Sequence, residues 1–245
     1  MRTIITYIYA ILGIVFCLPY HHYLKCLAKK DQDRAYIKAF KLVRGFFNGV
    51  MTLTGCKRTI IGKENIPEGE AVMFVGNHRS YFDILSCHNA INTPLGFMSK
   101  DGIKKIPLLY KYMDDIGCTY LDRDDMKKGL ETINQSAEII KSGHSMMIFP
   151  EGTRNKGDEL LPFKDGAYKI AQKAGCLIIP VAICGTDKCM EANKHYRLKS
   201  HKVVIEFLEP IDIRGLKPKE RKELLETIPG KIQTARLKNL PMTEN

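Results

Sequence analysis

The sequence has 245 residues, of which 38 are Lys or Arg and 27 are Asp or Glu, so its formal net charge is +11. With 44% hydrophobic and 27% charged residues, the chain can bury a sizeable core, which excludes a disordered or collagen-like chain. A positive charge of this size indicates an anionic partner, and charge alone does not choose between nucleic acid, anionic lipid and a phosphorylated substrate.

The eight cysteines are scattered singly along the chain, without a Cys-x-x-Cys pair. Disulfide frameworks and zinc sites both need Cys or His residues at characteristic spacings, and neither pattern occurs here. We therefore expect reduced thiols in a protein that faces the cytosol, and no bound metal.

The first distinctive feature along the chain is an uncharged apolar run from Thr3 to Pro19. Its 17 residues are at the lower limit of length for a helix that crosses a bilayer. A cleaved signal peptide is the alternative, but only Arg2 precedes the run and no small-x-small cleavage site follows it. The run therefore predicts a first membrane helix, which either spans the bilayer or dips into one leaflet.

A second helical pattern covers Arg34 to Thr54, with a broad aromatic and aliphatic face backed by cations. Such a face suits a helix at a lipid surface, and it equally suits a core helix of a soluble domain. Because the pattern directly follows the apolar run, residues 1–55 are predicted to form a two-helix membrane anchor. The apolar stripe consists of Tyr36, Phe40, Val43, Phe47 and Val50.

The charges on the two sides of the apolar run are unequal. Lys25, Lys29, Lys30 and Arg34 follow the run, whereas Arg2 alone precedes it. Segments rich in Lys and Arg stay on the cytoplasmic side of a membrane. We therefore expect a cell-membrane protein with the rest of the chain on the cytoplasmic side, in contact with anionic membrane lipid.

From residue 56 to residue 245, short β-rich runs alternate with helical patterns. This alternation predicts an α/β domain with a mixed, largely parallel central sheet flanked by helices, in which the isolated run Thr59 to Gly62 is an edge strand. The expected strands are Thr59–Ile61, Ala71–Val75, Leu95–Met98, Thr119–Leu121, Ser145–Phe149, Leu177–Ile183 and Val203–Leu208. The expected helices are Tyr81–Ala90, Ile106–Met113, Asp124–Lys141 and Gly166–Ala174, with a polar helix after Lys217.

A histidine and an aspartate flank the turn after the second expected strand, His78 and Asp83 in an H-x4-D arrangement. Ser80 between them is a natural helix N-cap, which puts Asp83 in the first turn of the helix. The carboxylate can then reach back to one imidazole nitrogen while the other nitrogen accepts a proton from a hydroxyl group. The alternative is a capping histidine in a chance match to a short motif.

The segment from Phe149 to Arg154 reads Phe-Pro-Glu-Gly-Thr-Arg and follows the apolar run Ser145 to Ile148. Open α/β sheets bind ligands at strand ends such as this one. Arg154 has a planar guanidinium that suits phosphate, and Gly152 lets the backbone approach a ligand closely. A solvated turn with an incidental Glu and Arg is the alternative.

Together these two segments resemble the signature blocks of the glycerolipid acyltransferases, the 1-acylglycerol-3-phosphate (lysophosphatidic acid) acyltransferase family. Two weaker blocks are similar as well, one running from Lys100 through Pro107 and Gly117 to Arg123, the other Ile179 to Ile183. Phe163 to Ala167 also matches the family's F-K-x-G stretch. The chain departs from the pattern after Lys100, where the family commonly has x-Glu-Leu and this chain has Asp-Gly-Ile.

The resemblance implies that residues 56–245 are an acyltransferase domain. It implies transfer of a fatty acyl group from acyl-CoA or acyl-acyl carrier protein to the sn-2 hydroxyl of lysophosphatidic acid, giving phosphatidic acid without a cofactor or metal. In that reaction His78 is the general base and Asp83 orients it. Ser80 and Cys87 are then a helix cap and a core thiol. The implied substrate-binding residues are Glu151, Gly152, Thr153, Arg154, Arg123 and Lys100.

Two alternatives stay open at this point. In the first alternative, the chain is an acyltransferase whose acceptor is another lysophospholipid or glycerol 3-phosphate, because these reactions share the motifs. In the second alternative, the chain is a non-catalytic membrane module that binds anionic lipid or nucleic acid. The occurrence of both signature blocks in one chain favours the enzyme over this module, and it argues against a nucleic-acid partner. A hydrolase is disfavoured because the dyad lacks a G-x-S-x-G elbow.

Overall fold

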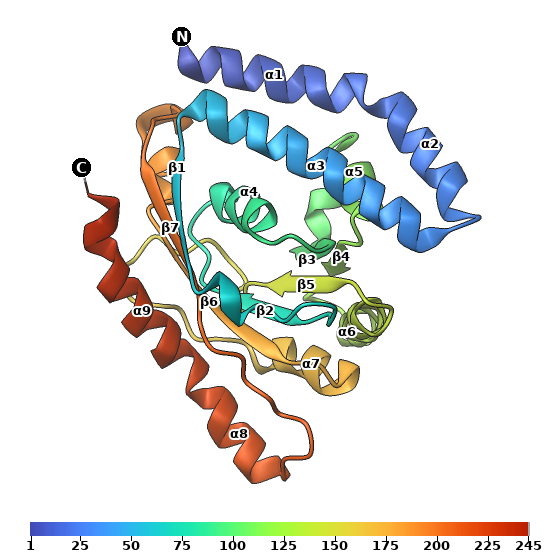
Figure 1. Cartoon of the computed structure of the whole chain (residues 1–245), viewed down its shortest axis with the longest axis vertical. Helices are drawn as coiled ribbons and strands as arrows, with labels where there is room; N and C mark the ends of the chain where they lie inside the picture. Colours follow the sequence, from blue (N-terminus) through green and yellow to red (C-terminus); the bar gives the residue numbers. More distant parts are fainter. Residues whose placement is uncertain (245) are drawn as a thin grey trace.

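The computed structural model describes residues 1–244, and within them seven strands form one sheet in the order β1-β7-β6-β2-β5-β3-β4 (Figure 1). Every neighbouring pair is parallel except β6 and β7, which are antiparallel. The strands are β1 (Lys57–Ile61), β2 (Met73–Gly76), β3 (Leu95–Lys100), β4 (Thr119–Leu121), β5 (Ser145–Ile148), β6 (Ile178–Cys184) and β7 (Lys202–Phe207). The predicted mixed, largely parallel α/β sheet is confirmed, with β1 at an edge.

Helices cover both faces of this sheet (Figure 1). The α-helices are α1 (Arg2–Phe16), α2 (Leu18–Ala28), α3 (Gln32–Thr54), α4 (Tyr81–Ala90), α5 (Leu109–Asp115), α6 (Met126–Lys141), α7 (Tyr168–Ala174), α8 (Pro218–Glu226) and α9 (Ile228–Thr243). The polar segment after Lys217 is two helices rather than the expected one, because Pro229 has no N–H to continue a helix and begins a new one.

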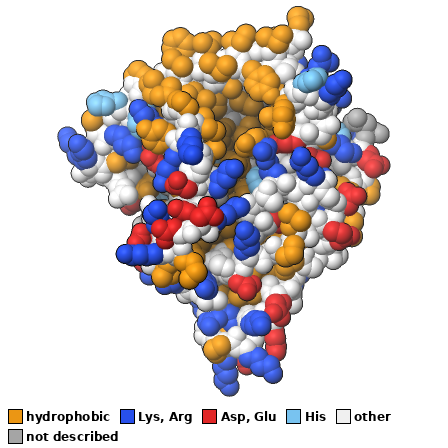
Figure 2. All heavy atoms as spheres, turned by 180° about the vertical axis from the view of Figure 1, so that it is seen from behind, with side chains coloured by type: hydrophobic (Ala, Val, Ile, Leu, Met, Phe, Trp, Pro, Cys, Tyr) orange, Lys and Arg blue, Asp and Glu red, His pale blue; other side chains and the backbone are white. Residues whose placement is uncertain are grey.

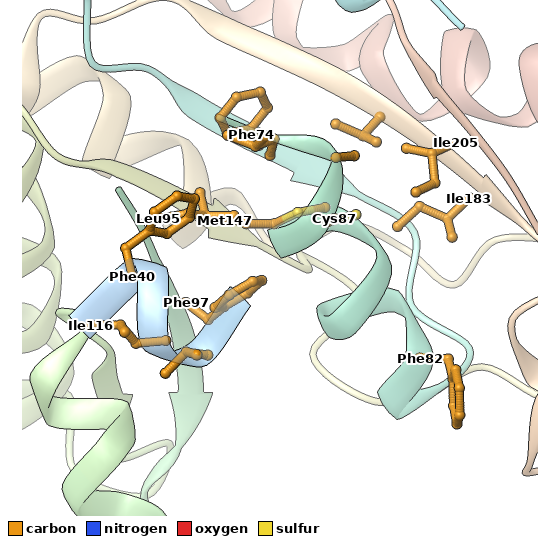
Figure 3. Close-up of a cluster of buried hydrophobic side chains, with 14 of the residues drawn as sticks. Phe40, Phe74, Phe82, Cys87, Leu95, Phe97, Ile116, Met147, Ile183 and Ile205 are labelled. Atoms are coloured by element: carbon orange, nitrogen blue, oxygen red, sulfur yellow. The ribbon is translucent and has the colours of Figure 1, made fainter. Parts of the chain in front are cut away.

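Two hydrophobic layers hold the sheet between its helices, because side chains along a strand alternate between its faces. In β2, Phe74 points into a layer shared with α3 and α4, while Met73 and Val75 point into a layer shared with α6, α7 and α9. Figure 3 shows the first layer, where Phe40 of α3 and Cys87 of α4 lie near Phe74. The strand sequences are apolar at almost every position because both faces of the sheet are buried.

The N-terminal segment does not form the predicted two-helix anchor. It contains three helices, and α3 is part of the domain core: Phe40, Val43 and Met51 are buried in the layer that also contains Phe74. The sequence predicts that the apolar stripe of α3 faces lipid, and this prediction is wrong: α3 packs on α4 and the sheet. Packing in a core and contact with lipid both remove an apolar face from water, so an apolar stripe is compatible with either.

Helix α1 packs across α3 through aromatic rings set against glycines. Tyr9 stacks on Phe46 with ring centroids 5.5 Å apart, and added Cβ atoms on Gly13 and Gly49 would collide with the Phe46 and Tyr9 rings. The opposite side of α1 is uncovered, and in Figure 2 apolar side chains gather along that edge of the molecule. The exposed apolar residues of α1 are Ile4, Ile5, Tyr7, Ile8, Ile11, Leu12, Val15 and Phe16.

Within residues 1–244, none of the helices taken singly combines the length and apolarity needed to cross a bilayer. Helices α1 and α2 meet that criterion only as a pair, and the pair is bent by 44° at its junction.

Candidate active site

The carboxyl ends of four parallel strands bring the predicted site residues to one edge of the sheet. The strand order β2-β5-β3-β4 places the segments after these strands side by side. His78 follows β2, Glu151 follows β5, Lys100 ends β3 and Arg123 follows β4. Ligand sites of open α/β sheets lie at this edge.

His78 and Asp83 form a hydrogen-bonded pair with the imidazole Nδ1 2.8 Å from Asp83 Oδ2. The same carboxylate oxygen accepts the backbone N–H groups of Arg79 at 2.7 Å and Ser80 at 2.8 Å. The Ser80 hydroxyl in turn accepts the N–H of Phe82, which completes a capping box at the start of α4. The cap therefore fixes the carboxylate that holds the histidine.

The environment of the pair determines which nitrogen of His78 carries the proton. The Asp83 side chain is completely buried, and its oxygen faces donors, so Nδ1 is the protonated nitrogen of the neutral ring. Within residues 1–244, Nε2 of His78 has no hydrogen-bond partner, and the side chain is 15% exposed. The ring also stacks on Phe149, with centroids 4.2 Å apart. Nε2 is thus a free acceptor on an immobilised ring.

Cys87 lies one helical turn beyond Asp83 and is fully buried (Figure 3). Burial, followed by the negative charge of Asp83, raises the pKa of its thiol well above the ordinary value. The thiol therefore stays protonated inside the core, and it is unsuited to act as a nucleophile.

Glu151 ties the loop after β5 to the turn that carries His78. One carboxylate oxygen accepts the backbone N–H of His78 at 2.8 Å. The other oxygen accepts the Asn155 side-chain amide and the backbone N–H of Leu161, both at 2.9 Å. Asn155 also donates its backbone N–H to the carbonyl of His78 at 2.7 Å. Glu151 is 4% exposed, and all of its contacts are within the protein.

The remaining predicted residues differ in whether they make hydrogen bonds to the site. Arg123 reaches the same loop and donates to the backbone carbonyl of Gly152, whose φ of +70° favours glycine. Lys100 and Thr153 are exposed, and within residues 1–244 neither side chain hydrogen bonds to another site residue. Hydrogen bonds thus join His78, Asp83, the Glu151 loop and Arg123, whereas among the described residues the side chains of Lys100 and Thr153 take no part in this network.

Arg154 is held by two residues that the sequence did not identify. Its guanidinium lies 4.0 Å from the centroid of the Tyr81 ring, and its Nη1 is 3.0 Å from Glu191 Oε1. Glu191 lies in the connection between β6 and β7, distant in the sequence from both signature blocks. The sequence carries no periodic or motif signal at this position.

This arrangement defines a class of site. A buried carboxylate holds an imidazole whose second nitrogen is free, and the adjoining loop carries Arg154 and is contacted by Arg123, so the site suits proton removal from a hydroxyl group beside an anion. Residues 57–184 match the family model described as Acyltransferase. The chain therefore belongs to the acyltransferase family, which confirms the resemblance found in the sequence.

Curated relatives agree with this assignment. The chain is 31% identical over 213 residues to the 1-acyl-sn-glycerol-3-phosphate acyltransferase of Salmonella typhimurium, covering 86% of this chain and 82% of that protein. It is 32% identical over 176 residues to 1-acyl-sn-glycerol-3-phosphate acyltransferase CHLREDRAFT_174358 of Chlamydomonas reinhardtii, covering 70% of this chain and 53% of that protein. The chain thus spans about half the length of the algal relative, and of two similar chloroplast proteins from plants.

A solved structure has the same fold. The crystal structure of the 1-acyl-sn-glycerophosphate (LPA) acyltransferase PlsC from Thermotoga maritima superimposes with a TM-score of 0.69 over 96% of this chain and 98% of that one. The sequence identity is 24%, so the likeness establishes the fold.

Proposed function

We propose that this chain transfers a fatty acyl group from an acyl thioester to the sn-2 hydroxyl of 1-acyl-sn-glycerol 3-phosphate, giving phosphatidic acid. The observation that carries the proposal is the His78–Asp83 pair, with a free Nε2, joined through Glu151 to the loop of Arg154. The Salmonella and Chlamydomonas relatives are named for this acceptor, which supports it here as well.

In the proposed reaction, Nε2 of His78 takes the proton of the sn-2 hydroxyl as its oxygen attacks the thioester carbonyl. A C–O bond forms, the C–S bond breaks, and the leaving thiolate takes the proton back from the imidazolium. Asp83 keeps Nδ1 protonated and stabilises the transient positive charge on the ring. No acyl-enzyme intermediate is involved, and the thioester of CoA or acyl carrier protein is a co-substrate, so the reaction needs no resident cofactor or metal.

Arg154 is proposed to bind the phosphate of the acceptor, with Arg123 and Lys100 adding positive charge along the sheet edge. A guanidinium can bind two phosphate oxygens at once, whereas an ammonium group acts as a point charge. Arg154 is 33% exposed, so part of its donor set faces solvent. Glu151 and Gly152 shape the loop, since Glu151 has all its contacts within the protein.

The proposed site of action is the cytoplasmic face of the cell membrane. The uncovered apolar side of α1 would enter the interfacial region of the bilayer, where acceptor and product both reside. The cations that follow the apolar run favour a cytoplasmic orientation and contact with anionic lipid.

The test follows thiol release and phosphatidic acid formation by detergent-purified protein, with long-chain acyl-CoA and acyl-acyl carrier protein as separate donors. Acceptors are lysophosphatidic acid, other lysophospholipids and glycerol 3-phosphate. We expect wild type to prefer lysophosphatidic acid and His78→Ala to lose about a hundredfold to ten-thousandfold in rate, the usual contribution of a general base.

His22→Ala is the matched control, because His22 is an exposed histidine on α2. It should keep full activity. If wild type released no thiol with any acceptor, the proposed function would be wrong, and a lipid-binding module without catalysis would replace it. If His78→Ala kept full turnover, His78 would not be the general base and the proposed mechanism would be wrong.

A further inference from the structure

The connection between β6 and β7 also contacts the site, although neither signature block includes it. It contains the short helices η4 (Asp187–Cys189) and η5 (Lys194–Tyr196). Asp187 pairs with Arg79 at 3.2 Å, and Glu191 pairs with Arg154 at 3.0 Å. Two arginines beside the dyad thus take their counter-charges from one loop.

The Glu191 carboxylate accepts three hydrogen bonds from two separate segments. Oε1 accepts the backbone N–H of Tyr81 at 2.9 Å and Nη1 of Arg154 at 3.0 Å. Oε2 accepts the hydroxyl of Ser80, the N-cap of α4. Glu191 therefore joins the helix that carries Asp83 to the loop that carries Arg154. At 14% side-chain exposure it is nearly buried.

These contacts fix the direction of the Arg154 guanidinium. The guanidinium lies over the Tyr81 ring, and one of its five N–H groups is bonded to Glu191. The guanidinium is thereby held by two contacts, the Tyr81 ring and the Glu191 carboxylate, and its other N–H donors remain available. A guanidinium oriented in advance loses less conformational entropy when it binds an anion than a freely rotating one.

The loop that carries Glu191 is itself anchored. Cys189 is fully buried, and its carbonyl accepts the N–H of Lys199 at 3.0 Å. The hydroxyl of Tyr7 on α1 donates to the carbonyl of Tyr196 at 3.0 Å. Tyr196 has a φ of +52°, a left-handed conformation that costs free energy and so requires such anchoring contacts.

We infer that Glu191 is a positioning residue that orients Arg154 for a phosphate group on the acceptor. This inference rests on the proposed function for the identity of that acceptor. Glu191 touches no reacting atom; it acts through Arg154 and determines how strongly the phosphate-bearing substrate binds.

The experiment compares Glu191→Ala, Glu191→Gln and Arg154→Ala with wild type in steady-state kinetics. Losing a charge-assisted hydrogen bond that orients a ligand group should raise the KM for lysophosphatidic acid about tenfold in Glu191→Ala. The value of kcat should stay within about twofold of wild type, and the KM for acyl-CoA should not change, because the bonds that hold the Asp83 carboxylate do not include Glu191. Glu191→Gln keeps a carbonyl oxygen that can face Tyr81 and Arg154, so it should recover part of the loss.

A double-mutant cycle tests whether Glu191 acts through Arg154. If it does, Glu191→Ala combined with Arg154→Ala should have the same acceptor KM as Arg154→Ala alone. The matched control is Glu206→Ala, which removes a carboxylate of similar exposure, 12%, that pairs with Lys238 of α9. It should leave the acceptor KM unchanged.

A binding measurement separates this inference from the proposed function. Calorimetric titration with sn-glycerol 3-phosphate, the soluble headgroup, should show about tenfold weaker binding to Glu191→Ala than to wild type, whether or not the protein turns over. An inactive wild type with this difference in affinity would refute the proposed function and support the role of Glu191. Equal affinities, or a loss confined to kcat or to thermal stability, would refute the role of Glu191.

Discussion

The backbone N–H of His78 donates to Oε1 of Glu151 at 2.8 Å. This bond joins the turn after β2 to the loop after β5, so the residues of the two signature blocks form one hydrogen-bonded unit. Three donors within the protein face the two oxygens of Glu151, which is 4% exposed. Glu151 therefore holds the geometry of the site, and His78 is the residue with a free acceptor.

Glu151→Gln should lower both stability and rate. Glutamine has one carbonyl oxygen and an NH2 group where the carboxylate accepts three donors, so at least one partly buried backbone N–H loses its partner, at a cost of about 1 kcal/mol. For a chain of this size, each kcal/mol lowers Tm by about 2–4 °C. Calorimetry and kcat measure the two effects. Glu159→Gln, at an exposed carboxylate of the same loop, should change neither; a Glu151→Gln protein as stable and active as wild type would contradict this account.

Gly152→Ala should strain the loop at the point where Arg123 meets it. The residue has a φ of +70°, and an added Cβ would lie 3.1 Å from Nη2 of Arg123. Alanine in this conformation costs about 1–2 kcal/mol, so we expect a lower Tm and a raised acceptor KM. Gly166→Ala is the control, because a Cβ there meets nothing within 4 Å. Equal Tm values for the two variants would show that the left-handed turn imposes no constraint.

His88 should make stability depend on pH. It is buried among the rings of Phe40, Phe47 and Phe97, and burial, followed by the charge of Arg44, lowers its pKa from 6.5 to about 3. Between these two values the unfolded chain binds more protons than the folded protein, so the free energy of unfolding falls as pH drops below about 6.5. The slope from this group is at most about 1.4 kcal/mol per pH unit.

Urea unfolding at several pH values, for wild type and His88→Leu, measures this slope. Both ring nitrogens of His88 lack partners within the described residues, so leucine leaves no buried donor unpaired. The difference between wild type and variant should grow as pH falls from 6.5. A difference that is constant with pH would mean that His88 titrates alike in the folded and unfolded states.

The uncovered side of α1 should carry lipid binding. Ile4 and Ile8 are 65% and 51% exposed, and burying half of an isoleucine side chain contributes about 1 kcal/mol. Replacing both by Asp should weaken binding to vesicles that contain anionic lipid by at least about tenfold, as measured by co-sedimentation. The control replaces Leu237 and Leu240 of α9, also exposed, by Asp. An equal effect of both pairs would indicate non-specific apolar binding and contradict the role of α1.

Local sequence patterns were sufficient to predict the strands, most helices and the dyad, because these depend on residues close together in the chain. His78 and Asp83 fall within one strand-to-helix turn, where the capping preference of Ser80 sets their geometry locally. The two main signature blocks are local too, and their presence in one chain was enough to identify the family.

Contacts between distant segments became visible only in the folded protein. The apolar stripe of α3 is the same whether it faces lipid or a sheet, and its burial against α4 resolved that choice. Glu191 is 37 residues from Arg154 in the chain, and no motif marks it. Its role arises because the connection between the adjacent antiparallel strands β6 and β7 lies at the carboxyl end of β6, beside the end of β2, where packing, rather than local preference, selects which charges meet.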